Sequence, residues 1–283
     1  MTFREDYADQ TWTYEEVSKR AMGIRDFFAA ARVSVHRDST LGVLLGEAEA
    51  LAREWENGRD TGGIARLVAA SNMNRIADAI DSIQEDLNAL EHLKRIARND
   101  VDLWKRKLSQ GKDALWELEL LGKLKRNGAQ ASILEPDIVV ELGSERYAIA
   151  CKKIYSERGV EAQVRKGVNQ IKAAGLPGIV ALNLDEMVPA GTLLQAGSLA
   201  EAKDFMHAFN VDFITRNRHR IERFMSSGRC KAILCSTSVP SGIETAKPRF
   251  NNHTQQTFWT LEKVSTAKGG KLLDLGRLLG ASI

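Results

Sequence analysis

Residues 13–110 contain no proline, and their apolar side chains recur at spacings of three and four residues. That spacing places the apolar side chains along one face of an α-helix, whereas a half-buried strand would alternate apolar and polar residues. We therefore expect this part of the chain to be α-helical, with helices over residues 13–33 and 39–58 and helical structure continuing over residues 61–108.

One apolar stripe in this helical region has the spacing of a packed helix face. Its members are Ile76, Ile80, Ile83, Leu87, Leu90 and Leu93. The stripe either packs within the chain, as part of a helical bundle, or forms a coiled-coil-like surface for a second copy or a partner protein. Residues 1–110 are thus predicted to be a helical region that serves interaction, dimerisation or sensing.

After Gly111 the pattern changes, and helices alternate with strand-like segments. The predicted helices cover residues 112–126, 156–178 and 199–227, and the predicted strands cover residues 133–142, 146–154, 178–186, 230–238 and 256–264. The polar residues 239–255 are expected to form an exposed loop. This order predicts an α/β domain over residues 111–283, in which a mixed sheet is flanked by helices and preceded by the all-α region.

The composition is that of a globular protein, with 43% hydrophobic and 27% charged residues. The net charge of +3 permits a nucleic-acid partner without requiring one. The three cysteines have no spacing typical of disulfide frameworks or zinc sites, which favours a reducing cytoplasm. The N-terminus has no apolar core, so we expect no signal peptide. Because no long uncharged apolar run occurs, we also expect no membrane span.

The helix over residues 112–126 carries a carboxylate on its apolar face. When the helix is wound at about 100° per residue, Glu117 falls among Leu120, Leu121 and Leu124, on the face that should turn toward the sheet. Glu119 falls on the opposite face. A carboxylate on an apolar face is costly unless it is paired or bound to a cation, so Glu117 is a candidate functional residue.

The two strands after this helix can gather further polar side chains. Ala148, Ala150 and Lys152 share one face of the second strand, because side chains alternate between faces. Asp137 lies near the start of the first strand, so a hairpin can bring it to Ala150 and Lys152. Glu117 can join them from the packed helix.

The segments "EPDIVV" and "YAIACKK", at residues 135–140 and 147–153, resemble the motif of the PD-(D/E)XK nucleases, which have the restriction-endonuclease-like fold. The resemblance covers residues 112–186, about a quarter of the chain. It implies that Glu117 is the helix carboxylate, that Asp137 is the central metal ligand and that Lys152 orients or activates the attacking water. It further implies Mg²⁺ or Mn²⁺ as cofactor and nucleic acid as partner.

Position 150, where the family has a second acid as a metal ligand, is alanine. Either the protein has lost a metal ligand and only binds nucleic acid, or Ala150 is a substitution that traps an inactive state. The intact Asp137 and Lys152 favour the second interpretation, in which the chain as given is inactive. In a third interpretation another acid, such as Glu161, has moved into the site.

The helix after the hairpin carries further candidates for the site. Gln163 and Gln170 lie on one side of this helix with Lys166 beside them. A glutamine here contacts the site or the cleaved strand in several branches of the family, which makes Gln163 the stronger candidate. The alternative is that both glutamines are solvated polar residues.

Basic residues are candidates for phosphate contact. These are Lys153, Lys166, Arg216, Arg220 and Arg223, of which the three arginines share a helix face. The alternative is a solvated helix face. The five histidines show no metal-ligand spacing and are assigned no role.

The residues and the resemblance together predict a metal-dependent nuclease of the cytoplasm, most simply a DNA endonuclease of restriction, repair or antiviral defence that acts as a homodimer. One alternative is a catalytically dead nuclease-fold module that binds nucleic acid or recruits a partner. The other is an interaction protein whose helical region is the functional part.

Overall fold

The structure is a computed structural model that describes residues 14–57, 63–83, 87–226, 228–246, 250–261 and 267–282. The N-terminal residues, for which the sequence predicts no signal peptide, lie outside these ranges, as does Gly58 at the predicted end of the second helix. None of the described helices is both long and apolar enough to cross a membrane.

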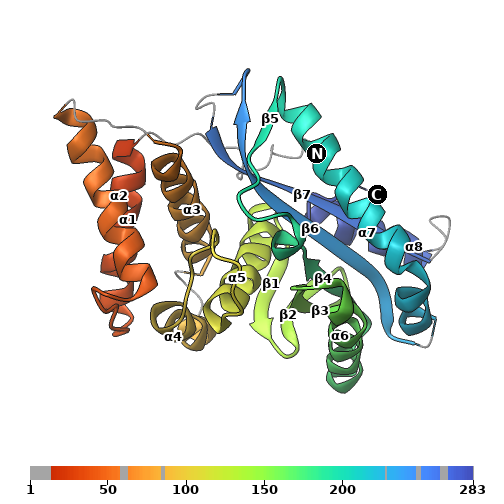
Figure 1. Cartoon of the computed structure of the whole chain (residues 1–283). Helices are drawn as coiled ribbons and strands as arrows, with labels where there is room; N and C mark the ends of the chain where they lie inside the picture. Colours follow the sequence, from red (N-terminus) through yellow and green to blue (C-terminus); the bar gives the residue numbers. More distant parts are fainter. Residues whose placement is uncertain are drawn as a thin grey trace.

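The N-terminal region consists of helices, and the last of them lies between the others and the sheet (Figure 1). Its α-helices are α1 (Tyr14–Ala30), α2 (Thr40–Glu56), α3 (Ile64–Asp81), α4 (Leu90–Arg98) and α5 (Gln110–Arg126). Ser109 caps α5, because its side chain accepts a hydrogen bond from the Gly111 N–H. The predicted all-α region is confirmed.

After α5, the described residues form one mixed sheet of seven strands with flanking helices. The strands are β1 (Gln130–Leu134), β2 (Asp137–Leu142), β3 (Glu145–Lys153), β4 (Gly178–Asn183), β5 (Leu194–Ala196), β6 (Cys230–Ile243) and β7 (Phe250–Thr260). The flanking helices are α6 (Val160–Ala174), α7 (Leu199–Met225) and α8 (Ala267–Leu278). The α/β class is therefore confirmed.

The strand order is β1-β2-β3-β4-β6-β5, and β7 pairs with β6. The β3–β4, β4–β6 and β5–β6 pairs are parallel, whereas β1–β2, β2–β3 and β6–β7 are antiparallel. Helices α6 and α7 pack on the sheet face that carries Ala148, Ala150 and Val180. Helix α5 packs on the other face, with Ile149 and Cys151.

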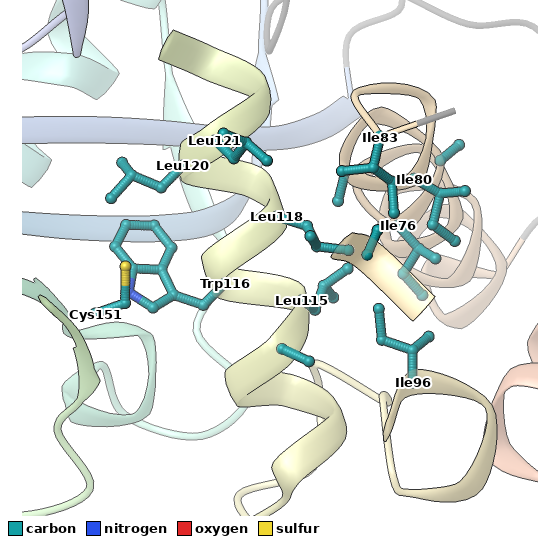
Figure 2. Close-up of a cluster of buried hydrophobic side chains, with 14 of the residues drawn as sticks. Ile76, Ile80, Ile83, Ile96, Leu115, Trp116, Leu118, Leu120, Leu121 and Cys151 are labelled. Atoms are coloured by element: carbon teal, nitrogen blue, oxygen red, sulfur yellow. The ribbon is translucent and has the colours of Figure 1, made fainter. Parts of the chain in front are cut away.

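One hydrophobic core joins the helical region to the sheet. Leu115 and Leu118 of α5 point toward isoleucines of α3, while Trp116 on the other side of α5 points toward Cys151 of β3 (Figure 2). Because α5 contributes apolar side chains in both directions, residues on either side of position 110 belong to the same buried cluster.

The apolar stripe of the helical region packs mainly within the chain. Ile76, Ile80, Ile83 and Leu93 are buried, whereas Leu90 is 41% exposed. The side chain of Leu87 lies outside the described part. Intramolecular packing is therefore confirmed for these four residues, and dimerisation stays a prediction.

The structure corrects two boundaries that the sequence predicts. Helix does not continue over residues 61–108, because α3 ends at Asp81 and no described residue between α4 and α5 is helical. The strand predicted over residues 133–142 is two strands, β1 and β2, with Glu135 and Pro136 in the turn. Proline lacks the N–H that a strand interior needs, which is the physical reason for the break.

The predicted exposed loop over residues 239–255 is also wrong in large part. Strand β6 continues to Ile243, β7 begins at Phe250, and Asn252, His253 and Gln255 are buried. The interior here is lined with amides and hydroxyls, so the apolar alternation that marks a strand is missing from the sequence. Strand β5 and helix α8 were not predicted.

Candidate active site

Asp137 and Lys152 meet where β2 begins and β3 ends. Asp137 Oδ2 accepts hydrogen bonds from Lys152 Nζ at 3.0 Å and from the Cys151 backbone N–H at 2.7 Å. Lys152 Nζ also donates to the Cys151 carbonyl oxygen at 2.6 Å. Since Ile138 pairs with Ile149 in the antiparallel ladder, the register places Asp137 beside the end of β3. The predicted approach of Asp137 to Lys152 is thus present.

Glu117 reaches this region from α5 and is buried, as its place on the apolar helix face predicts. His92 of α4 donates a hydrogen bond from Nε2 to Glu117 Oε2 at 2.5 Å, and Arg95 Nη1 lies 4.0 Å from the same oxygen. These contacts supply the partner that a buried carboxylate needs. His92 was assigned no role from the sequence, because nothing in its spacing connects it to a carboxylate on the next helix.

The pKa of Asp137 is raised to about 6. The main cause is burial, which disfavours the charged carboxylate, and the second is the negative charge of Glu117. The positive charge of Lys152 and the Cys151 N–H act in the opposite direction. The charge of Glu117 thus acts on Asp137, whereas the direct contact in this region is between Asp137 and Lys152.

Asp113 is an acid of this region that the sequence analysis did not single out. It lies one turn before Glu117 on α5, and Tyr155 Oη donates a hydrogen bond to its Oδ1 at 3.2 Å. Burial raises the pKa of Asp113, the nearby cations Lys153 and Lys152 lower it, and the charge of Glu117 raises it. In the sequence, the spacing of four residues between Asp113 and Glu117 could have indicated that both acids lie on the same side of the helix.

The donor chemistry suits a hard divalent cation. Asp137 and Glu117 offer carboxylate oxygens, and Mg²⁺ is often bound through one or two carboxylates plus water and substrate oxygens. Within the described ranges no three His, Cys, Asp or Glu side chains are grouped so as to hold a metal ion by themselves. Water and phosphate would therefore have to supply most of the ligands of an ion bound at these residues.

Ala150 follows Ile149, the partner of Ile138, so the β2–β3 register places its backbone beside Asp137. It is fully buried in the apolar core between the sheet and α6, in the same cluster as Val164 and Val168. A Cβ atom added at Gly167 of α6 would lie 3.4 Å from the Ala150 Cβ and 2.9 Å from Val180 Cγ1. The helix and sheet are packed closely here.

Glu161 forms ion pairs with Arg165 and Arg223 rather than with residues of the Asp137 cluster. Gln163 and Gln170 are half-buried on α6, and Lys166 is exposed. The Oε1 atom of Gln170 is buried with no hydrogen-bond partner. The structure does not bring these four α6 residues into contact with Asp137.

The predicted basic face of α7 is occupied by ion pairs. Arg216 pairs with Glu157 and Asp212, and Arg223 pairs with Glu161. Arg220 Nη1 donates to Asn217 Oδ1 at 3.3 Å. Phosphate would therefore have to compete with carboxylates at two of the three arginines.

Lys153 and Glu119 belong to a buried charged group on the α5 side of the sheet. Arg75 of α3 donates hydrogen bonds to Glu119 and, at 2.8 Å, to Asp185 Oδ2. Lys153 is 5% exposed, and burial lowers its pKa. The expectation that Glu119 faces away from the core is wrong, because α3 covers that side of α5. A lysine as buried as Lys153 is poorly placed for contact with a nucleic-acid backbone.

The three cysteines are buried and free.

Comparisons of the chain with protein-family models, with curated proteins and with solved structures find no match.

Proposed function

We propose that this protein is a divalent-metal-dependent nuclease that hydrolyses phosphodiester bonds, with DNA as the favoured substrate. The observation that carries the proposal is the cluster at the end of β3, where Lys152 bonds Asp137 and where burial, together with the charge of Glu117, raises the pKa of Asp137. A carboxylate whose ionised form is disfavoured by burial and by a second acid, beside a lysine, is typical of a functional site that a cation would stabilise.

In this proposal Asp137 and Glu117 hold Mg²⁺ or Mn²⁺. When bound, such an ion lowers the pKa of an attacking water and offsets the negative charge that grows on the phosphate. Lys152 fixes Asp137 in place and adds a positive charge where the oxyanion develops. His92 orients Glu117 through the bond to Oε2. The Cys151 N–H also fixes Asp137 by donating a second hydrogen bond to its carboxylate.

The test is a cleavage assay on duplex DNA, single-stranded DNA and RNA, with Mg²⁺ or Mn²⁺ and with a chelator. Because the proposal takes Asp137 and Glu117 as the ligands and requires no acid at position 150, metal-dependent cleavage by the chain with Ala150 is expected. Asp137→Ala and Lys152→Ala should each slow it by at least about 100-fold. Lys172→Ala, which removes an exposed lysine from α6, is the matched control. Cleavage that survives Asp137→Ala would refute the assignment of the site.

A second candidate is a nuclease-fold module that binds nucleic acid or a partner without cutting. The packing of Ala150 under Gly167 favours it, because the alanine fits the core and a second acid is missing there. This module would bind DNA or RNA with a steep salt dependence and leave all three substrates intact. The absence of cleavage under every metal condition, together with such binding, would favour this candidate over the nuclease.

A further inference from the structure

Helix α4 holds an arginine beside the carboxylate of Glu117. Arg95 Nη1 lies 4.0 Å from Glu117 Oε2, which is close enough for an ion pair but too long for a hydrogen bond. The same oxygen already accepts the 2.5 Å hydrogen bond from His92. Arg95 therefore adds a positive charge next to Glu117, while its own N–H donors stay available for another acceptor.

A second arginine follows one turn later on the same side of α4. Arg98 lies three residues after Arg95 and is exposed. No described residue accepts a hydrogen bond from either guanidinium. Glu91, the acid on this side of α4, is hydrogen-bonded to Lys94 at 2.6 Å and interacts with the two arginines only through its charge. Because a guanidinium has five N–H donors, both arginines can still bind an oxyanion.

Packing fixes the backbone that carries these arginines. The Asn99 side chain donates a hydrogen bond to the Arg95 carbonyl oxygen at 2.8 Å, at the end of the helix. Apolar side chains of α4 and α5 belong to one core. The side of α4 away from the arginines is buried and consists of His92, Leu93, Ile96 and Ala97. A ligand of the two arginines would therefore lie at a defined place relative to Glu117.

The arginines of α7 offer a contrast. Arg216 and Arg223 are held in ion pairs with carboxylates, which a phosphate would have to displace. A phosphate at Arg95 or Arg98 would displace no hydrogen bond from a described residue. Helix α4 is therefore better suited to phosphate contact than the α7 face that the sequence predicts.

Arg95 is more exposed than the residues that it borders. Its side chain is 39% exposed, compared with 11% for Glu117, 13% for Asp137 and 8% for Lys152. Of these four side chains, Arg95 is thus the one that a ligand can reach most readily from solvent. Its positive charge would offset the repulsion between a substrate phosphate and the two carboxylates.

We propose that Arg95 and Arg98 bind successive phosphates of the nucleic-acid strand on which the Asp137 cluster acts. Arg95 holds the phosphate beside Glu117, and Arg98 holds the next phosphate of the same strand. The inference rests on the proposed function, because it names the residues with which that site holds its substrate. It assigns this role to α4, which lies outside the residues that resemble the nuclease motif.

The test is the binding of short, fluorescein-labelled single-stranded DNA, duplex DNA and RNA to the full chain, measured by fluorescence anisotropy in a chelator. At about 50 mM salt, Arg95→Met and Arg98→Met should each weaken at least one of the three by about fivefold or more. Each should also lower the slope of log affinity against log salt by about one. Arg53→Met, which removes an exposed arginine from α2 and the same charge, is the matched control and should change neither.

Two results would overturn the inference. One is an affinity and a salt slope that equal those of Arg53→Met in both folded variants. The other is the absence of binding to all three nucleic acids. Because Arg98 is exposed, its substitution leaves the core intact, and Arg98→Met decides the outcome if Arg95→Met fails to fold.

A cleavage assay with Mg²⁺ separates this inference from the proposed nuclease. If the chain cuts nothing but both variants bind nucleic acid more weakly than Arg53→Met, the arginines hold nucleic acid and only the nuclease proposal fails. If the chain cuts, Arg98→Met should raise KM by about fivefold and leave kcat unchanged, as expected for a contact that is equally strong in the transition state. Cleavage with the KM of Arg53→Met in both variants would remove the arginines from the site and leave the nuclease in place.

Discussion

Lys152 Nζ and Asp137 Oδ2 are 3.0 Å apart in a partly buried ion pair, yet the pKa of Asp137 is raised to about 6. The lysine therefore does not fully compensate for the burial of the carboxylate and for the negative charge of Glu117. An additional positive charge at this point, such as a divalent ion, would stabilise the ionised form of Asp137.

Asp137→Asn is predicted to stabilise the protein at pH 8 and to have little effect at pH 4. The pKa of Asp137 is raised from 3.8 to about 6 on folding. The Asp137 side chain therefore stabilises the folded protein fully below about pH 4, and this contribution is lost as the pH rises through about 6. Above that pH the buried charge costs up to about 3 kcal/mol, which asparagine avoids.

Urea unfolding of both proteins between pH 4 and 8, in the presence of a chelator, measures this difference. Asp212→Asn, which removes an exposed carboxylate on α7, is the control and should show no such trend. The raised pKa requires the difference in free energy of unfolding between Asp137→Asn and the unsubstituted chain to change between pH 4 and pH 8. An equal difference at both pH values would contradict it.

Ala150→Glu is predicted to lower the free energy of unfolding by more than about 3 kcal/mol, because it overpacks the core and buries a charge. The reason is the close approach of Gly167 to the fully buried Ala150. Ala162→Glu, at an exposed position of α6, is the matched control and should be nearly neutral. If Ala150→Glu instead folded normally and cut nucleic acid faster, the alanine would be a substitution in an otherwise functional site.

Arg75→Met is predicted to cost about 3–5 kcal/mol, because Glu119 and Asp185 would keep buried charges without their common partner. The matched control is Arg53→Met on α2, since Arg53 is exposed. Chemical denaturation gives both values. If Arg75→Met lowered the free energy of unfolding by less than about 1 kcal/mol, the ion pairs of Arg75 with Glu119 and Asp185 would not be what stabilises the packing of α3 against α5.

The parts of the site that depend on local patterns could be predicted from the sequence. The alternation in β2 and β3 brings Asp137 to Lys152, and the helical periodicity of α5 turns Glu117 inward. The parts that depend on tertiary packing could not. His92 and Arg75 reach α5 from other helices, and only the packing of α3 over α5 shows that Glu119 is buried. The first half of strand β7, residues 250–255, escaped prediction because its buried residues are amides and a histidine rather than apolar side chains.

Calorimetric titration of Mn²⁺ into the full chain tests the central claim most directly, because it measures the cation site without requiring turnover. The account predicts one saturable site whose affinity falls by more than about tenfold in both Asp137→Asn and Glu117→Gln, and little in Asp212→Asn. The affinity should also fall as the pH drops below about 6, where Asp137 takes up a proton. Absence of saturable binding, or an affinity unchanged by Asp137→Asn, would contradict it.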